Sequence, residues 1–398
     1  MTRVLQVFNR YQERSGEELI VFELEEALIK RDDIVPSLFM ADSREWAGHK
    51  GPWWPVKLWK MFFNKAIERQ LCHLIQSDQI DVMIVHNVYP ILSPAVYAAA
   101  RKSNIPVIQY LHNYRPFSVG GSLWSGHHLI DAGLRGKHWP EIRAKSWQNS
   151  FFKSLFMGII LKRFVNSSGI NSITRWVACS DFVNRKFLSA GIDDQKIVTI
   201  RHGWESMEKA PEIWDDGYYL LIARLVPEKG IETAINAWEV LERKLGDACP
   251  KLIIAGAGSE EDRVRFAVGK LKSIRFVGYV SGRRKDRLLR RCRAPLAPSV
   301  WWEPLGLVTY EAYDYGKPMM AAASGGLKET IIDGVTGFLH EAGNADDLAQ
   351  SVIKMEAKTP RERLEMGEKG RAWLLTEANY EKWVSRVAEL IQEVKNPS

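Results

Sequence analysis

Cysteine is scarce in this sequence, and the few cysteines are scattered. Only residues 72, 179, 249 and 292 are cysteines, and no two of them have the spacing of a CxxC motif. Histidines do not join them in a short-range cluster, so the sequence predicts neither a structural zinc site nor a disulfide framework. Scattered thiols are typical of a reducing compartment, and we therefore expect a cytoplasmic protein.

Long hydrophobic runs are also missing. The most apolar stretch, residues 151–165, is interrupted by Lys153, Lys162 and Arg163. It is shorter than the about 20 residues that a helix needs to cross a bilayer. The N-terminal segment MTRVLQVFNRYQERSG lacks the long apolar core of a signal peptide. We expect a soluble protein, or one bound peripherally at the inner face of the plasma membrane.

The charge balance is only moderately one-sided. A formal net charge of +7 is compatible with an anionic ligand, a membrane surface or nucleic acid. The basic residues are spread along the chain, and their one local cluster, residues 283–293, is interpreted as an exposed helix face. Nucleic acid is therefore not an expected partner. With 46% hydrophobic and 26% charged residues, the composition excludes disordered and fibrous proteins.

The 398 residues suffice for two domains. Short apolar runs alternate with amphipathic segments, which is the pattern of βαβ units with parallel sheets. The predicted strands form two series, at 4–8, 82–86, 107–111, 176–179 and 198–200, and at 218–223, 252–255, 275–277, 294–297 and 319–322. Residues 202–217 lack periodicity and are predicted to be a linker. Ligands bind beyond the carboxyl ends of such strands, so we expect two sheets facing a central cleft that holds the site.

The densest set of candidate functional residues is WEPLGLVTYEA at 302–312, followed by GKP at 316–318. Pro304 is predicted at the first turn of a helix and Gly316 at its C-terminal cap. The N-terminus of that helix would offer backbone N–H groups to a phosphate, which Gly306 leaves unobstructed. Glu303 and Glu311 are suited to accept hydrogen bonds from sugar and ribose hydroxyls. A solvated glutamate and a capping glutamate are the structural alternative.

A second candidate, ARLVPEKG at 223–230, directly follows a predicted strand. Arg224 supplies a planar fork and Lys229 a point charge, a combination that suits a diphosphate. The two cations would offset the charge that develops on a leaving nucleotide diphosphate. Two basic residues in a loop are commonly surface charge, and it is their position upstream of Glu303 that favours the functional interpretation.

Other signals are weaker. The turns GAGSE at 256–260, VGYV at 277–280 and SGG at 324–326 would let a backbone approach a base or ribose, although a tight turn explains them equally well. Gly16 opens the first predicted helix, where a phosphate or donor sugar could meet backbone N–H groups. His112 ends a predicted strand and is expected to point toward the same cleft. His86, His127 and His128 are interpreted as structural.

Taken together and in this order, the motifs resemble those of GT4-family retaining glycosyltransferases, which have the GT-B fold. The resemblance covers almost the whole chain. It is strongest between residues 218 and 339, where RLVPEKG, GAGSEED, FVGYV, EPLGLVTYEAYDYGKP, SGGLKETI and DGVTGFL follow one another. Glu303 and Glu311 have the spacing of the family's E-x7-E motif. The resemblance implies transfer of a hexose from a UDP- or GDP-sugar to a glycan or lipid-linked acceptor in polysaccharide or glycolipid biosynthesis.

The resemblance also implies a division of the chain and a role for each matching residue. Residues 1–203 would bind the acceptor, residues 204–380 would bind the nucleotide-sugar donor, and residues 381–398 would form a helix crossing back to the N-terminal domain. No metal or other cofactor is expected, because family members carry no DxD motif. The residues implied in catalysis are His112, Arg224, Lys229 and Glu303, and those implied in donor binding are Gly16, Arg224, Lys229, Gly258, Tyr279, Val280, Glu303, Leu305, Gly306, Leu307 and Glu311.

The sequence departs from the family pattern at three places. Ser15 stands where many relatives have the first glycine of a pair, which puts the fit around the diphosphate in doubt. His202 replaces a common asparagine, and Leu305 replaces a frequent phenylalanine. None of these changes removes a charge that the reaction needs.

The segment from Arg44 to Arg69 combines aromatic and basic residues. It contains Trp46, Trp53, Trp54, Trp59, Phe62 and Phe63 among Lys50, Lys57, Lys60 and Lys65. A helix from about Pro55 would place Leu58, Met61 and Phe62 on one face. Such a segment suits an anionic membrane surface, a clamp for a carbohydrate acceptor, or a helix docked on its own domain. Residues 151–163 could add a second apolar contact.

Other functions remain open from the sequence alone. A sugar-nucleotide epimerase or a phosphorylase could have the same fold, and a non-enzymatic basic protein would need a clustered basic stripe. For a transferase, retention without an obvious nucleophile favours attack from the face that the leaving group departs. Glu303 is the only carboxylate considered as a nucleophile in a covalent route.

Overall fold

The computed structural model describes residues 1–12, 16–47, 51–126, 128–166, 168–209, 211–212 and 214–397. It divides into two compact units. Unit 1 comprises Met1–Ser125, Ile130–Gly203 and Glu381–Ser398, and unit 2 comprises Gly126–Leu129 and Trp204–Tyr380. Three residues named in the predictions, Ser15, Lys50 and His127, lie outside the described residues.

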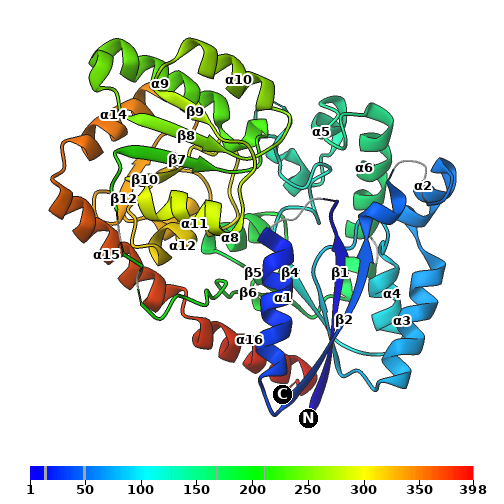
Figure 1. Ribbon diagram of the computed structural model, residues 1–398. Coiled ribbons are helices and arrows are strands. Elements are labelled where there is room, and N and C mark those ends of the chain that lie inside the picture. The colour runs from blue at the N-terminus through cyan, green and yellow to red at the C-terminus, as the bar shows by residue number, and fades with distance from the viewer. Residues whose placement is uncertain are drawn as a thin grey trace. The chain divides into compact units, whose positions relative to one another are not determined.

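Unit 1 contains one parallel sheet of six strands (Figure 1). Its strand order is β2-β1-β3-β4-β5-β6, so the connection reverses direction between β1 and β3. The strands are β1 (Thr2–Arg10), β2 (Ile34–Asp42), β3 (Val82–Val85), β4 (Val107–Leu111), β5 (Arg175–Ala178) and β6 (Ile197–Thr199). The helices are α1 (Gly16–Ile29), α2 (Trp54–Phe62), α3 (Lys65–Ser77), α4 (Ala95–Lys102), α5 (Trp139–Arg143), α6 (Phe151–Val165), α7 (Ser168–Asn171), α8 (Asp181–Ser189) and α16 (Tyr380–Lys395).

Unit 2 contains a second parallel sheet of six strands in the order β12-β11-β10-β7-β8-β9. This is the strand order of a doubly wound dinucleotide-binding sheet, and its direction reverses between β7 and β10. The strands are β7 (Tyr218–Ile222), β8 (Lys251–Ala255), β9 (Ile274–Phe276), β10 (Ala294–Ala297), β11 (Met319–Ala322) and β12 (Gly337–His340). The helices are α9 (Ile231–Leu245), α10 (Glu261–Lys270), α11 (Gly282–Arg291), α12 (Leu307–Asp314), α13 (Leu327–Thr330), α14 (Ala345–Glu356) and α15 (Pro360–Glu377).

The α/β fold class with two parallel sheets is confirmed. All ten predicted strands form, each within two residues of its predicted bounds, but β2 and β12 were not predicted. Both lie at the edge of their sheet. β2 contains Pro36 and a run of half-buried residues, and β12 has only four residues and begins with Gly337. Neither edge strand has the continuous apolar run that marks a strand buried on both faces.

The last helix, α16, completes the core of unit 1. Trp383 is buried, and its indole Nε1 donates a hydrogen bond to the Tyr110 hydroxyl at 2.8 Å. Val387 and Ile391 follow Trp383 at helical spacing and are also buried. The helix therefore packs on unit 1 through an apolar stripe.

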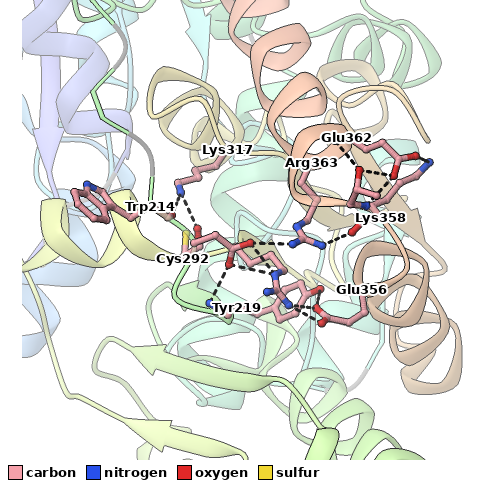
Figure 2. Close-up of polar contacts among 12 residues, drawn as sticks. Trp214, Tyr219, Cys292, Lys317, Glu356, Lys358, Glu362 and Arg363 are labelled. Atoms are coloured by element: carbon pink, nitrogen blue, oxygen red, sulfur yellow. Dashed lines mark hydrogen bonds and ion pairs between the residues drawn. The ribbon is translucent and has the colours of Figure 1, made fainter.

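The described residues of the segment predicted to be a linker, 202–217, form no regular helix or strand, but side chains of unit 2 hold the segment in place. Lys317, 1% exposed, donates hydrogen bonds to the carbonyl oxygens of Trp214 and Cys292 at 2.7 and 2.8 Å (Figure 2). Arg293 pairs with Asp215 at 3.0 Å. Desolvation lowers the pKa of Lys317, but the two carbonyl oxygens accept hydrogen bonds from its buried ammonium group. Lys317 of the GKP motif is therefore a structural residue.

One negative finding concerns membranes. Among the described residues, no helix combines the length and the apolar character needed to cross a bilayer.

Candidate active site

The candidate site of unit 2 lies at the carboxyl edge of its sheet. Arg224 and Lys229 follow β7, and Glu303 follows β10. These two strands are neighbours, and the winding direction reverses between them. Ligands of doubly wound sheets bind at this position because the loops on either side diverge there. The fold therefore brings two distant motifs to one place.

The central contact of the site is an ion pair between Lys229 and Glu303. Glu303 also accepts a hydrogen bond from the Ser299 hydroxyl at 2.8 Å, and the Lys229 ammonium lies 5.2 Å from the centroid of the Trp301 ring. Burial by itself would raise the pKa of Glu303, but the attraction of Lys229 and the hydrogen bonds from Lys229 and Ser299 hold it below the usual value. Glu303 is thus an ionised, buried acceptor at neutral pH.

The turn after β11 holds the loop that carries Glu303 in place. Gly326 donates a backbone hydrogen bond to the Glu303 carbonyl at 2.7 Å, and the Ser324 hydroxyl donates to the Trp301 carbonyl at 2.5 Å. Gly325 has a φ of +59°, and a Cβ there would lie 2.2 Å from the Glu303 carbonyl oxygen. Only glycine combines this backbone conformation with so close an approach. The SGG motif therefore positions Glu303.

The helix of the EPLGL motif begins later than predicted. Pro304 was expected in its first turn, but Pro304 lies in a bend and α12 begins at Leu307, with Gly306 as its N-cap. Gly306 has a φ of +91°, and a Cβ there would lie 2.4 Å from the Leu327 side chain. Leu305 is buried. The N-cap residue Gly306 has no side chain that could cap α12, so the first amides of the helix, beginning at Leu307, are suited to bind an anion. The prediction for Gly316 holds, because its φ of +61° follows the helix end.

Glu311 pairs with a residue that the sequence did not point to. Its carboxylate forms an ion pair with Lys285 of α11, a helix interpreted from sequence as an exposed basic face. Most of that face is exposed, but Lys285 is half-buried and contacts Glu311. The signal available in the sequence was weak, because one lysine among many basic residues has no distinguishing neighbour.

The remaining predicted donor-binding residues lie on loops at the same edge. Arg224 is half-exposed, and its guanidinium is 4.0 Å from Glu228. The loop of Gly258 is bonded to the loop of Arg224, because Leu225 donates to the Ala257 carbonyl and Glu260 donates to the Leu225 carbonyl, both at 2.8 Å. Tyr279 is exposed and Val280 is buried. These residues and Glu303 lie at the same edge of the unit 2 sheet. Among the described residues, no direct contact joins their side chains.

His112 of unit 1 belongs to a buried aromatic stack. Its ring lies 5.1 Å from that of His86 and 5.4 Å from that of His202, and Tyr110 stacks on all three. Each histidine follows the carboxyl end of a strand. Desolvation lowers the pKa of His86 and His202 to about 3 and holds that of His112 well below its usual value. All three rings are therefore neutral at physiological pH.

The hydrogen bonds of this stack determine which ring nitrogen of His112 carries the proton. Gln6 donates its amide N–H to Glu25 at 2.5 Å, which turns its carbonyl oxygen toward His86 Nε2 at 2.8 Å. His86 Nε2 must then be the donor, so His86 Nδ1 accepts from His112 Nε2 at 2.8 Å. In a neutral His112 the other nitrogen, Nδ1, is left as an acceptor. His86, interpreted as structural, thus fixes the tautomer of His112.

His86 and His112 also line a pocket in unit 1, together with Glu17, Tyr89, Asn113 and Arg115. Glu17 directly follows the predicted site residue Gly16, which begins α1. Asn113 donates to Glu17 at 3.1 Å and to the Tyr11 hydroxyl at 3.3 Å. Desolvation raises the pKa of Glu17 to about 7. Sequence reasoning missed Glu17 and Asn113, although each adjoins a residue that it singled out.

Within the described ranges, no three His, Cys, Asp or Glu side chains are arranged to hold a metal ion.

Comparison with known proteins identifies the family. Residues 2–205 match the model of "Glycosyltransferase Family 4", and residues 204–373 match "Glycosyl transferases group 1". An uncharacterized glycosyltransferase of Methanocaldococcus jannaschii is 34% identical over 35% of this chain and 36% of its own length. A GDP-mannose-dependent phosphatidylinositol monomannoside mannosyltransferase of Mycolicibacterium smegmatis is 28% identical over 51% of this chain and 55% of its own length. The chain thus spans between about a third and just over half the length of these relatives.

Solved structures show the same fold. HepE of Anabaena in complex with UDP aligns with a TM-score of 0.66 and 17% identity, covering 99% of this chain and 100% of that one. Sucrose-phosphate synthase of Thermosynechococcus elongatus aligns with a TM-score of 0.71 and 15% identity over 99% of both chains. The strand order of unit 2 and the match over more than half of the chain agree with these likenesses. The chain belongs to Glycosyltransferase Family 4 and has the GT-B fold.

Proposed function

We propose that this glycosyltransferase transfers a hexose from a UDP- or GDP-sugar to a glycan or lipid-linked acceptor, with retention of anomeric configuration and without a metal ion. The observation that carries the proposal is the buried Lys229–Glu303 pair beside the uncapped N-terminus of α12. Cations and free amides bind phosphate, and an ionised carboxylate binds hydroxyls. In this proposal residues 204–380 bind the donor and residues 1–203 bind the acceptor.

The relatives support the choice of substrates. The mycobacterial mannosyltransferase is named for GDP-mannose and a phosphatidylinositol mannoside, and HepE was crystallised with UDP. We therefore place this protein in the synthesis of cell-surface polysaccharides or glycolipids, and its site of action in the cytoplasm.

The proposed reaction uses the residues as follows. Arg224, Lys229 and the first amides of α12 bind the diphosphate and stabilise the charge that develops on it as the bond between the sugar C1 and the diphosphate oxygen breaks. Glu303 binds hydroxyls of the sugar, Glu311 binds the ribose, and main-chain groups around Gly258, Tyr279 and Val280 hold the base. His112 contacts the transferred sugar, where its Nδ1 lone pair accepts from a sugar hydroxyl. The acceptor oxygen forms the new bond to C1, and its proton passes to the diphosphate.

A donor screen tests this function. Thermal unfolding is measured with UDP-, GDP- and ADP-sugars, because a ligand that binds only the folded state raises the melting temperature by mass action. The stabilising donor is then used to measure slow hydrolysis and transfer. We expect transfer to be unaffected by EDTA and the product anomer, read by NMR, to match the donor.

Variants sharpen the test. Lys229→Ala and Glu303→Gln should each reduce transfer by at least about a hundredfold, as the loss of one stabilising group does in comparable sites. Lys244→Ala, which removes an exposed lysine from the last turn of α9, is the matched control. Full turnover in both site variants would refute the proposal. Interconversion of donors without an acceptor would instead indicate an epimerase.

A further inference from the structure

Two helices of unit 1 form a single exposed face that has no role in the proposed reaction. α2 and α6 are far apart in sequence, but the rings of Phe62 and Phe156 lie 6.5 Å apart. The Arg163 guanidinium lies 5.1 Å from the centroid of the Phe62 ring. Figure 1 shows α2 beside α6, with α5 on the other side of α6. We call the outer side of α2 and α6 the aromatic face.

The aromatic face exposes large apolar side chains that a water-soluble surface would normally bury. On and before α2, Trp53, Trp54 and Trp59 are 72%, 63% and 73% exposed. On α6, Phe152 and Ile159 are 80% and 51% exposed and lie two turns apart on the same side. Trp139 of α5, 55% exposed, joins them through its edge-on contact with Phe151. Contiguous apolar patches of this kind mark interaction sites.

Only part of α2 packs against unit 1: Trp59 lies off the packed side, and Trp54, one turn before Leu58, is exposed at the start of the helix. Met61 is buried, and Leu58 and Phe62 are partly buried. The helix is therefore docked on unit 1 by the face that the sequence predicted, and its tryptophans remain exposed to solvent. The same helix can therefore pack on its own domain and present its exposed side chains to a binding partner.

The charge of the face is of one sign. α2 carries Lys57 and Lys60, α6 carries Lys153, Lys162 and Arg163, and neither helix contains an aspartate or glutamate. The ammonium of Lys57 donates to the Trp46 carbonyl and that of Lys153 to the Gln148 side chain, so these two contacts neutralise no charge. Elsewhere in the chain lysines and arginines are commonly paired, as on α10, α11 and α15.

We propose that the aromatic face docks the protein on the surface of a membrane containing anionic lipids. Tryptophan rings favour the headgroup zone, where they bury apolar area and still bond to water, and the basic side chains of two helices that carry no acidic residue are attracted to the negative surface potential. A polar protein partner would leave the indoles without an apolar environment, and a soluble polyanion would use only the cations. The docking is independent of the transfer reaction.

Vesicle flotation tests the docking. The protein should float with vesicles of phosphatidylcholine and phosphatidylglycerol and remain behind with phosphatidylcholine alone, and added salt should weaken the binding. Brominated acyl chains should quench part of the tryptophan emission of the unaltered protein. Equal binding to neutral vesicles, or no flotation and no quenching, overturns the proposal.

Variants distinguish the face from the rest of the surface. Trp53→Ser, Trp59→Ser and Phe152→Ser combined should abolish flotation, while Phe266→Ser, an exposed ring beside a lysine on unit 2, should have no effect. Lys60→Gln and Lys153→Gln should each weaken binding to anionic vesicles about fivefold. Urea midpoints and donor-induced thermal shifts of all variants should equal those of the parent. Undiminished flotation of the triple variant, or its loss in Phe266→Ser, contradicts the assignment, and a polyanion bound equally well by the triple variant would indicate a charge-only site.

Discussion

At the scale of single residues, the free energy of the Lys229–Glu303 pair balances the cost of desolvating two charges against their mutual attraction. Each charge is mostly removed from water, which costs free energy, and each is compensated by the other. Lys229→Met should therefore destabilise the protein by about 3 kcal/mol, because Glu303 is left as an uncompensated buried charge. Adding Glu303→Gln should restore part of that loss. Urea unfolding of the four proteins in a double-mutant cycle measures the coupling, and a coupling near zero would mean that the side chains do not interact.

The three stacked histidines make unit 1 sensitive to acid. Their pKa values are lower in the folded protein than the unfolded value of about 6.5. The unfolded chain therefore binds more protons below pH 6.5, so the stabilisation is complete above that pH and declines as the pH falls toward 3. At pH 5 the expected loss is about 2 kcal/mol each for His86 and His202, and His112 adds a loss in the same direction.

Glu17 acts in the opposite direction. Its pKa is raised to about 7 in the folded state, so its contribution is present below its unfolded pKa and is lost as the pH rises through 7. The acid sensitivity is best measured in a Glu17→Gln background by urea unfolding at pH 7 and pH 5. His202→Phe, which keeps the stacked ring, should remove the part of the loss in unfolding free energy between pH 7 and pH 5 that His202 contributes. An unchanged pH dependence would show that His202 does not titrate as inferred.

At the scale of elements, the turn after β11 should be as important for activity as the residues that bind substrate. Gly325→Ala would place a Cβ against the Glu303 carbonyl, so we expect Glu303 to shift and transfer to fall at least about tenfold. Gly334→Ala is the matched control, because Gly334 also has a positive φ of +73° but open space around its Cβ position. Both variants should lose stability through the positive φ, with a further loss in Gly325→Ala from the close contact, and only Gly325→Ala should lose transfer. Equal kinetics in the two variants would assign Gly325 to the fold alone.

The sequence predicted elements better than it predicted contacts. Strands such as 82–85 and 319–322 were recognisable because they are buried on both faces and therefore apolar throughout. β2 and β12 were missed because an edge strand has no such requirement. Motif spacing pointed to Lys229 and Glu303, but it could not pair Glu311 with Lys285 or stack His86 and His202 on His112. Those contacts depend on how loops from separate strands meet, which no local pattern encodes.

At the scale of the whole molecule, the two units should respond to different perturbations. Trp383 is buried in unit 1, so Trp383→Ala should destabilise that unit by about 3–5 kcal/mol. A nucleotide-sugar should instead stabilise unit 2, where the candidate donor site lies. Hydrogen exchange read by mass spectrometry separates the two effects, since protection is reported peptide by peptide. Uniform loss of protection in both units of Trp383→Ala would mean that they unfold as one.

Residues 204–380, which make up nearly all of unit 2, are an insertion in the chain of unit 1, and the two ends of this insertion meet. Trp204 donates a backbone hydrogen bond to the Ala378 carbonyl at 2.9 Å, and Trp204 and Asn379 form a parallel bridge. A segment that leaves and re-enters its host at one point can be exchanged without stretching the host's chain. Grafting 204–380 from a relative with another sugar donor should therefore yield a chimera that folds, and under the proposed division of roles the chimera should use the relative's donor.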